Sequence, residues 1–219
     1  MQYRIFLLSP ANSTGKRVDM LFSPRAGFEL AWRFQQTGAP IGELFSFVSG
    51  LYFRGKLLYA NHFCKSPDGV PGVLVITSNR GLLRAETVLT KEELHSFSKV
   101  EIDLADRRYV RSLRKSAIEI AEKLPEDSEV VLLGSISSKK YVELLLEIFK
   151  DRLKFPPDFV GRGDMSRGGL MLRCVEANKE LEYTPIAGAI RHGKRPPKLE
   201  PKRWTNVVLN PGDRRPPES

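Results

Sequence analysis

Polar residues follow three apolar runs of the sequence, each at the point where the run ends. They are Ser9 and Asn12 after the first run, Ser78, Arg80 and Gly81 after the second, and Ser135 after the third. In an open α/β sheet, ligands usually bind outside the carboxyl ends of the strands. If the three runs are parallel strands, we therefore expect these residues to meet at one edge of the sheet and to bind a ligand there.

A second group of candidate residues lies between Gly161 and Gly169, where the chain has four glycines among nine residues. Glycine costs conformational entropy, so this density indicates that the backbone approaches something closely; the alternative is a flexible surface loop. Arg162 and Arg167 are candidates for contacts with a base. Asp164 is a candidate acid or base, and Ser78 is the other catalytic candidate.

The polar loop from Ser9 to Arg17 looks like a phosphate cradle but does not match Walker A. Pro10 stands where that motif needs its first glycine, and Arg17 stands where it needs Ser or Thr. Proline donates no amide hydrogen and arginine cannot ligate a metal, so only a looser anion site is compatible with this loop. The sequence also shows no Ser–His–Asp order, metal-ligand cluster or paired carboxylates. We expect neither a metal nor a cofactor.

The apolar pattern predicts the elements that position these side chains. Strands are expected at Tyr3–Leu8, Val73–Ile76 and Glu129–Gly134, where short runs of apolar residues require burial on both faces. Gly81 allows a sharp turn after the second strand. Helices are expected over residues 23–36, 51–63, 90–99, 106–124 and 140–153, the third and fourth of them capped by Thr90 and Asp106. Leu44–Val48 is either a strand or a buried turn.

Strands that alternate with helices predict a parallel sheet with crossover helices. The fold class is therefore expected to be α/β, a Rossmann-like three-layer sandwich with a mostly parallel central sheet. A C-terminal β-hairpin is predicted from Leu170–Glu176 and Glu180–Thr184. We expect residues 1–184 to form a single α/β domain and residues 185–219 to form a basic, proline-rich C-terminal arm.

Positive charge is concentrated in this arm, which has eight Lys or Arg against three acidic residues and contributes +5 of the net charge of +9. Such charge indicates a polyanionic partner, most simply nucleic acid. Five residues are candidate phosphate contacts: Arg107, Arg111, Arg191, Lys194 and Arg195. Arg107 and Arg111 belong to a basic helix face. The alternative interpretation is that this face is only a solvated surface.

The remaining composition is that of an ordinary globular protein, with 41% hydrophobic and 28% charged residues. No apolar run approaches the length of a membrane span, so we expect no membrane partner. Cys64 and Cys174 lack metal-ligand spacing and indicate two reduced thiols in a cytoplasmic protein. The sequence predicts no particular oligomeric state.

Three segments resemble the YaaA family, which is implicated in peroxide stress. They are the SPA of Ser9–Ala11 after the first strand, SNRGLLRAETVL at Ser78–Leu89, and LGSISSKKYVELL at Leu133–Leu145, where Tyr141 matches the tyrosine of the family. Arg80 and Ala85 replace a tyrosine and a proline of the family pattern, and the Pro-Tyr-Arg that follows it is missing. The resemblance covers roughly the first 150 residues. It implies a nucleic acid or a nucleobase-like ligand, because relatives bind DNA and the broader group includes domains associated with base-exchange or glycosidase-like enzymes.

Two functions follow as expectations. The first is a nucleic-acid-binding α/β protein that holds phosphates with its basic residues and reaches bases with Arg80, Arg162 or Arg167. The alternative is an enzyme acting on a nucleotide or nucleobase, glycosidase- or transferase-like, in which Asp164 acts as acid or base beside the polar strand ends. A deep pocket around Ser9, Ser78, Asp164 and Arg167 would favour the enzyme, and a flat basic surface would favour binding.

Overall fold

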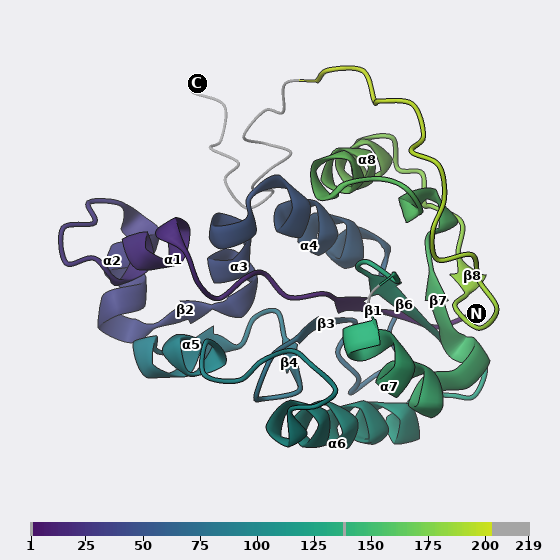
Figure 1. Cartoon of the computed structure of the whole chain (residues 1–219), viewed down its shortest axis with the longest axis horizontal. Coiled ribbons are helices and arrows are strands. Elements are labelled where there is room, and N and C mark those ends of the chain that lie inside the picture. The colour runs from purple at the N-terminus through teal and green to yellow at the C-terminus, as the bar shows by residue number, and fades with distance from the viewer. Residues whose placement is uncertain (1, 138, 203–219) are drawn as a thin grey trace.

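The computed structural model describes residues 2–137 and 139–202, arranged as Figure 1 shows. In these residues, six strands form one sheet in the order β4-β3-β1-β6-β7-β8. The strands are β1 (Arg4–Leu8), β3 (Val73–Ile76), β4 (Leu82–Arg84), β6 (Glu129–Leu133), β7 (Leu153–Phe155) and β8 (Thr184–Pro185). Strands β3, β1, β6 and β7 are parallel, whereas β4 and β8 pair antiparallel at the two edges. The predicted α/β fold with a mostly parallel central sheet is confirmed.

Successive side chains of the central strands enter two separate hydrophobic cores, because side chains alternate between the faces of a sheet. Phe6 and Leu8 of β1 face a core shared with α3 (Ile41–Ser49), α4 (Leu51–Phe63) and α8 (Asp164–Glu176). Ile5 and Leu7 face the other core, shared with α6 (Arg107–Lys123) and α7 (Lys139–Phe149). Helices therefore cover both faces, and Figure 1 shows the three layers with α4 and α8 above the sheet.

The remaining elements lie beyond the carboxyl end of β1, at the left of Figure 1. They are the helices α1 (Lys16–Phe22), α2 (Glu29–Thr37) and α5 (Lys91–Phe97), with a small antiparallel sheet of β2 (Ala39–Pro40) and β5 (Val88–Leu89). Two 3₁₀ turns, η1 (Lys150–Arg152) and η2 (Pro157–Phe159), flank β7. This group of helices stands next to the edge at which the strand ends carry their polar residues.

Two helix starts have the caps that the sequence predicts. Thr90 and Glu93 exchange side-chain to backbone hydrogen bonds at the start of α5, which makes a capping box. Asp106 accepts a hydrogen bond from the Arg108 amide at the start of α6. The helix expected at residues 51–63 is α4, with those same bounds.

Several predictions of secondary structure are wrong. The Leu170–Glu176 segment belongs to α8 instead of a β-hairpin, and only Thr184–Pro185 after it is a strand. The Leu44–Val48 segment is helical, and the last predicted helix ends at Phe149. Of the helix expected over residues 23–36, only the later part is helical, as α2, and the unpredicted α1 precedes it. Short apolar runs fit a strand or a buried helix equally well, and packing on the sheet decides between them.

Glycines bring α4 and α8 unusually close together. A Cβ atom added to Gly168 would lie 2.7 Å from the Leu51 carbonyl oxygen, and one added to Gly55 would lie 2.8 Å from the Gly168 carbonyl oxygen. Both contacts are with backbone, so neither helix can carry a side chain there without moving. The close approach that the glycine-rich segment predicts is confirmed, and it is made against α4.

The segment after β8 runs without helix or strand up to residue 202, and it begins with the fully buried Ile186. It lies along α8, where the Arg162 guanidinium donates to the Pro197 carbonyl oxygen and Lys202 pairs with Glu176. The rest of the predicted arm, residues 203–219, lies outside the described residues.

Cys64 and Cys174 are unpaired. Among the helices that the structure describes, every one is too short or too polar to cross a membrane.

Candidate active site

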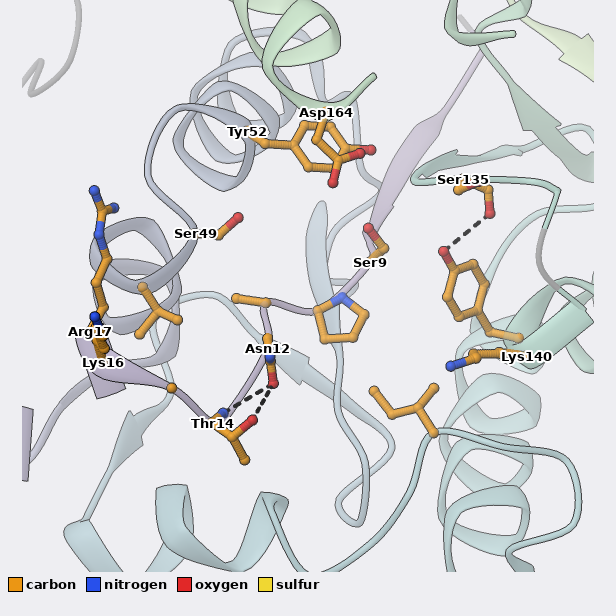
Figure 2. Close-up of a pocket in the computed structure, with 16 residues that line it drawn as sticks. Ser9, Asn12, Thr14, Lys16, Arg17, Ser49, Tyr52, Ser135, Lys140 and Asp164 are labelled. Atoms are coloured by element: carbon orange, nitrogen blue, oxygen red, sulfur yellow. Dashed lines mark hydrogen bonds between the residues drawn. The ribbon is translucent and has the colours of Figure 1, made fainter. Parts of the chain in front are cut away.

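An open cavity of about 640 Å³ lies at the carboxyl ends of β1 and β6 (Figure 2). Its polar lining comes from the loop after β1, the start of α4, the β6–α7 connection and the start of α8. The lining residues include Ser9, Asn12, Thr14, Lys16, Arg17, Ser49, Tyr52, Ser135, Lys140, Tyr141 and Asp164. Five predicted site residues are therefore brought together: Ser9, Asn12, Ser135, Tyr141 and Asp164.

Ser9 occupies the first position after β1, where its backbone amide still donates to the Leu133 carbonyl oxygen of β6. Nearby, the Tyr141 hydroxyl donates to the Ser135 carbonyl oxygen at 3.1 Å, and it lies close enough to the Ser9 side chain for Ser9 to favour the ionised phenol. Gly134 makes room for this arrangement, because a Cβ atom there would lie 2.8 Å from Ser9 Cβ and 3.1 Å from the Tyr141 hydroxyl. Ser9 and the Tyr141 hydroxyl therefore both lie next to Gly134 at the cavity wall.

Sequence reasoning missed Lys56, which lies directly behind Ser9. Its side chain is 1% exposed, and its Nζ donates to the Ser9 carbonyl oxygen at 2.5 Å and to Ser9 Oγ at 2.8 Å. The same Nζ lies over the rings of Tyr52 and Phe53, at 4.5 and 4.8 Å from their centroids. Among the residues of α4, the sequence shows Lys56 only as one polar residue of a predicted helix. In fact it is in helical register with buried Phe53, Tyr59 and Phe63, and a lysine in such a stripe was the signal available.

Burial has a large effect on the protonation of this group. It lowers the pKa of Lys56 from its ordinary value to about 7, because the ammonium ion loses its hydration; nearby Arg167 lowers the pKa further and the Asp164 carboxylate opposes the shift. Burial likewise raises the pKa of Tyr52 to about 12, and it raises the pKa of Tyr141. Near neutral pH, Lys56 is therefore present both as the amine and as the ammonium ion, and both phenols keep their protons.

The start of α8 supplies the acidic and basic groups opposite the strand ends. The Asp164 side chain is 68% exposed and faces the cavity beside Tyr52, as Figure 2 shows. Arg167 is held by a hydrogen bond to the Phe159 carbonyl oxygen at 3.1 Å, and its guanidinium lies 3.5 Å from Asp164 Oδ1. The Tyr52 hydroxyl is buried without a well-formed hydrogen bond among the described residues, although Arg167 lies close enough to favour its ionised form.

The second predicted strand end does not contribute to this cavity. β3 turns tightly through Gly81, which has φ +67°, into antiparallel β4, and this directs the connecting loop toward α5. There the buried Ser78 hydroxyl donates to the Phe97 carbonyl oxygen at 2.8 Å, and Arg80 forms an ion pair with Glu93. The sequence predicts that Ser78, Arg80 and Gly81 lie with Ser9. Instead, Ser78 and Arg80 contact α5, and Gly81 packs against Ser112 and Ser116 of α6.

A second, smaller cavity of about 420 Å³ lies next to the first. Arginines dominate its wall, which consists of Ser137, Gly161, Arg162, Gly163, Arg167, Arg191, His192, Gly193 and Arg195. Residues close in sequence line the two cavities, namely Ser135 and Ser137, and Gly163 and Asp164, so the two are neighbours. Neither Arg191 nor Arg195 forms an ion pair with any described residue.

Three of the predicted phosphate contacts fall outside these cavities. Arg107 and Arg111 are exposed on α6 and line neither of them. Lys194 is exposed and turns its carbonyl group toward Gly161, where a Cβ atom would lie 2.3 Å from that oxygen. Within the described part of the chain, no group of three or more His, Cys, Asp or Glu side chains could hold a metal ion.

No family model, curated protein or solved structure matches this chain. The resemblance to the YaaA family therefore stays a prediction. The case for a function depends on the geometry of the two cavities.

Proposed function

We propose that the protein is an enzyme that acts on a nucleotide or nucleobase, glycosidase- or transferase-like, with the larger cavity as its active site. The observation that carries the proposal is the convergence of Ser9, Tyr141 and Asp164 on one cavity at the carboxyl ends of the strands. A carboxylate and two hydroxyls in one cavity, with the shifted pKa of Lys56 directly behind its wall, are the features expected of an active site. Its volume lies within the range of small-molecule sites.

Electrostatics supports an anionic substrate. Lys16, Arg17 and Lys140 line the cavity, whereas Asp164 is its one acidic lining residue among those described. The neighbouring arginine cavity extends the positive charge past the start of α8. A nucleotide could place its base or sugar in the larger cavity and a phosphate among the arginines, since guanidinium groups bind phosphate in a bidentate manner.

Replacing Asp164 by asparagine tests this assignment. We expect nucleoside monophosphates to raise the Tm of the wild-type protein more than the matching nucleosides do, because only the former carry a phosphate. When turnover of a nucleotide is followed by chromatography, Asp164→Asn should slow it by roughly 10²- to 10⁴-fold, the usual contribution of a general acid or base. Asp158→Asn is the matched control, because that exposed carboxylate lies on η2 and lines neither cavity. No stabilisation by any nucleotide or base would contradict the proposal.

The arginine cavity favours a second candidate function, binding to a nucleic-acid strand. Four arginines line it, and within the described residues no carboxylate belongs to its lining. Arg107 and Arg111 would be additional phosphate contacts on the exposed face of α6. In this case the nucleotide that enters the larger cavity would be part of a nucleic-acid strand.

Salt dependence measures this binding. Because each phosphate contact releases condensed counterions, log K should fall with log salt at a slope of about −0.9 per contact on a duplex. Fluorescence anisotropy from roughly 50 to 200 mM salt should show that Arg191→Ala/Arg195→Ala flattens the slope by about 1 to 2 units. Lys65→Ala/Lys123→Ala removes the same charge from exposed residues outside both cavities and should leave the slope nearly unchanged. Equal effects of the two pairs would mean that only net charge matters.

A further inference from the structure

We propose that Ser9 is a nucleophile and that Lys56 is its general base, which makes the reaction a transfer of a phosphoryl group. This inference rests on the proposed assignment of the larger cavity as an active site. Ser9 is on the cavity wall, whereas Lys56 is sealed behind it with Nζ 2.8 Å from Ser9 Oγ. A nucleophile and a base within hydrogen-bonding reach, with the base oriented by a third group, is the arrangement of an activated serine.

The third group here is the backbone of Ser9 itself. The carbonyl oxygen of Ser9 accepts one N–H of Lys56 at 2.5 Å, which directs the rest of the amino group toward Oγ. A neutral amine has one lone pair, and in this orientation the lone pair can accept the Ser9 hydroxyl proton. The Tyr52 and Phe53 rings enclose the same nitrogen and keep water from it. If Lys56 only linked β1 to α4 by hydrogen bonds, any hydrogen-bond donor would serve. An amine that can lose its proton would not be required.

The charges around Lys56 come from each element that packs against it. Asp164 and Arg167 face it from α8 with opposite effects, and Tyr52 adjoins it on α4. Burial outweighs these charges and brings the pKa of Lys56 to about 7. At neutral pH a substantial share of the molecules therefore has the base in its active, unprotonated form.

The side chains at the cavity and a water molecule or acceptor hydroxyl are sufficient for the chemical step. The Ser9 hydroxyl proton passes to the Lys56 amine, Oγ forms a bond to the phosphorus atom, and the leaving group departs with its electron pair. Water or an acceptor hydroxyl then attacks the phosphorus, and the Oγ–P bond breaks. The attacking group gives its proton to the Asp164 carboxylate, which passes it to the departed leaving group, while the Lys56 ammonium returns a proton to Ser9 Oγ. Glycosidases use a carboxylate nucleophile, so a serine favours the transferase-like reaction, and the basic lining suits a phosphate.

Labelling with diisopropyl phosphorofluoridate tests the dyad independently of any nucleotide. The reagent presents a tetrahedral phosphorus atom, and attack by Oγ forms the Oγ–P bond and releases fluoride. We expect one adduct, mapped to Ser9 by mass spectrometry, with a rate that rises with pH to a plateau and has its midpoint near the pKa of Lys56. Ser9→Ala should abolish labelling, and Ser98→Ala, which removes an exposed hydroxyl at the end of α5 outside both cavities, should leave the rate unchanged.

Two variants at Lys56 separate catalysis from structure. Lys56→Met removes the base, and Lys56→Arg keeps a donor that cannot lose its proton; each should slow labelling at least 100-fold and remove the pH midpoint. Equal labelling of either folded variant and the wild type would overturn the proposal, as would an unmodified Ser9 in the wild type at pH 8. The Tm shift caused by nucleotides is measured separately. If nucleotides raise the Tm but Ser9 is not labelled, only the Ser9–Lys56 inference is contradicted. Labelling without any nucleotide effect contradicts only the choice of substrate.

Discussion

The wild-type protein is expected to gain stability relative to Lys56→Met as the pH rises from 7 to 9. The folded protein binds the Lys56 proton with a pKa of about 7, whereas the unfolded chain binds it with the ordinary lysine value of 10.5. Between these values the unfolded state holds more protons, so the free energy of unfolding rises with pH. The rise should be about 2 kcal/mol, since one pKa unit is worth about 1.4 kcal/mol and the lysine is already half deprotonated at pH 7.

Urea denaturation of both proteins at pH 5, 6, 7, 8 and 9 gives the difference between their free energies of unfolding. The contributions of other titrating groups are the same in both proteins and cancel from this difference. One such group is Cys174, whose pKa burial raises to about 11, so that it lowers the stability of both proteins above pH 9. Below about pH 6, Lys56 is protonated in both the folded and the unfolded state, and the two stability curves should run parallel. Parallel curves up to pH 9 would show that the folded lysine has an ordinary pKa.

This pH dependence connects stability with the proposed chemistry. A buried ammonium ion is unfavourable, and methionine would fill a similar volume without it. The two hydrogen bonds from Lys56 to Ser9 offset part of the cost of burying the ammonium ion. Lys56 therefore lowers the stability of the fold while it orients the Ser9 hydroxyl at the cavity wall. Such a cost fits a functional role, because active sites generally contain groups that reduce stability.

How much the sequence could predict depended on whether the signal was local. The strand at Val73–Ile76 and the capped helices at Thr90 and Asp106 are coded by residues within a few positions of one another, and all three are found. Parallel strands end at one edge of a sheet, so Ser9 and Ser135 could be placed together from topology alone. The same argument failed for Ser78, because β3 is followed by a hairpin turn into β4, where Gly81 was the only warning.

The wrong prediction for α8 and the failure to find Lys56 share a physical cause, which is contact between segments far apart in the sequence. The sequence predicts the second half of α8, Leu170–Glu176, as a strand because its apolar run fits one, whereas packing on α4 favours a helix. Lys56 was missed in the sequence for the same reason. Its surroundings are Ser9 of β1 and residues of α8, which no local pattern reveals.

Gly168→Ala is expected to destabilise the protein because it forces α4 and α8 apart. The new methyl group would lie 2.7 Å from the Leu51 carbonyl oxygen and 2.9 Å from Tyr52 Cα, and backbone atoms cannot rotate away. Overpacking of this kind costs about 1–3 kcal/mol. For a chain of this length that corresponds to a fall in Tm of roughly 3–10 °C. The same displacement moves Tyr52 and Lys56 relative to Asp164, so nucleotide turnover and Ser9 labelling should fall with it.

Gly169→Ala is the matched control for this prediction. It lies in the same turn of α8, but its added methyl group would meet only the Leu199 side chain, at 3.7 Å, which is ordinary contact. Because alanine favours a helix over glycine by up to about 1 kcal/mol, this variant should be as stable as the wild type or slightly more stable. Equal melting temperatures for the two variants would mean that the helices do not touch at Gly168.

A double-mutant cycle with Gly55→Ala identifies the contact itself. A Cβ atom at Gly55 would lie 2.8 Å from the Gly168 carbonyl oxygen, so either substitution alone forces the same separation of α4 and α8. Once the helices have moved apart, the second methyl group meets less resistance. The double variant should therefore lose less stability than the two single losses added together, by at least about 0.5 kcal/mol, as expected for residues in direct contact. Strictly additive losses would place the two glycines in separate, independent packing sites.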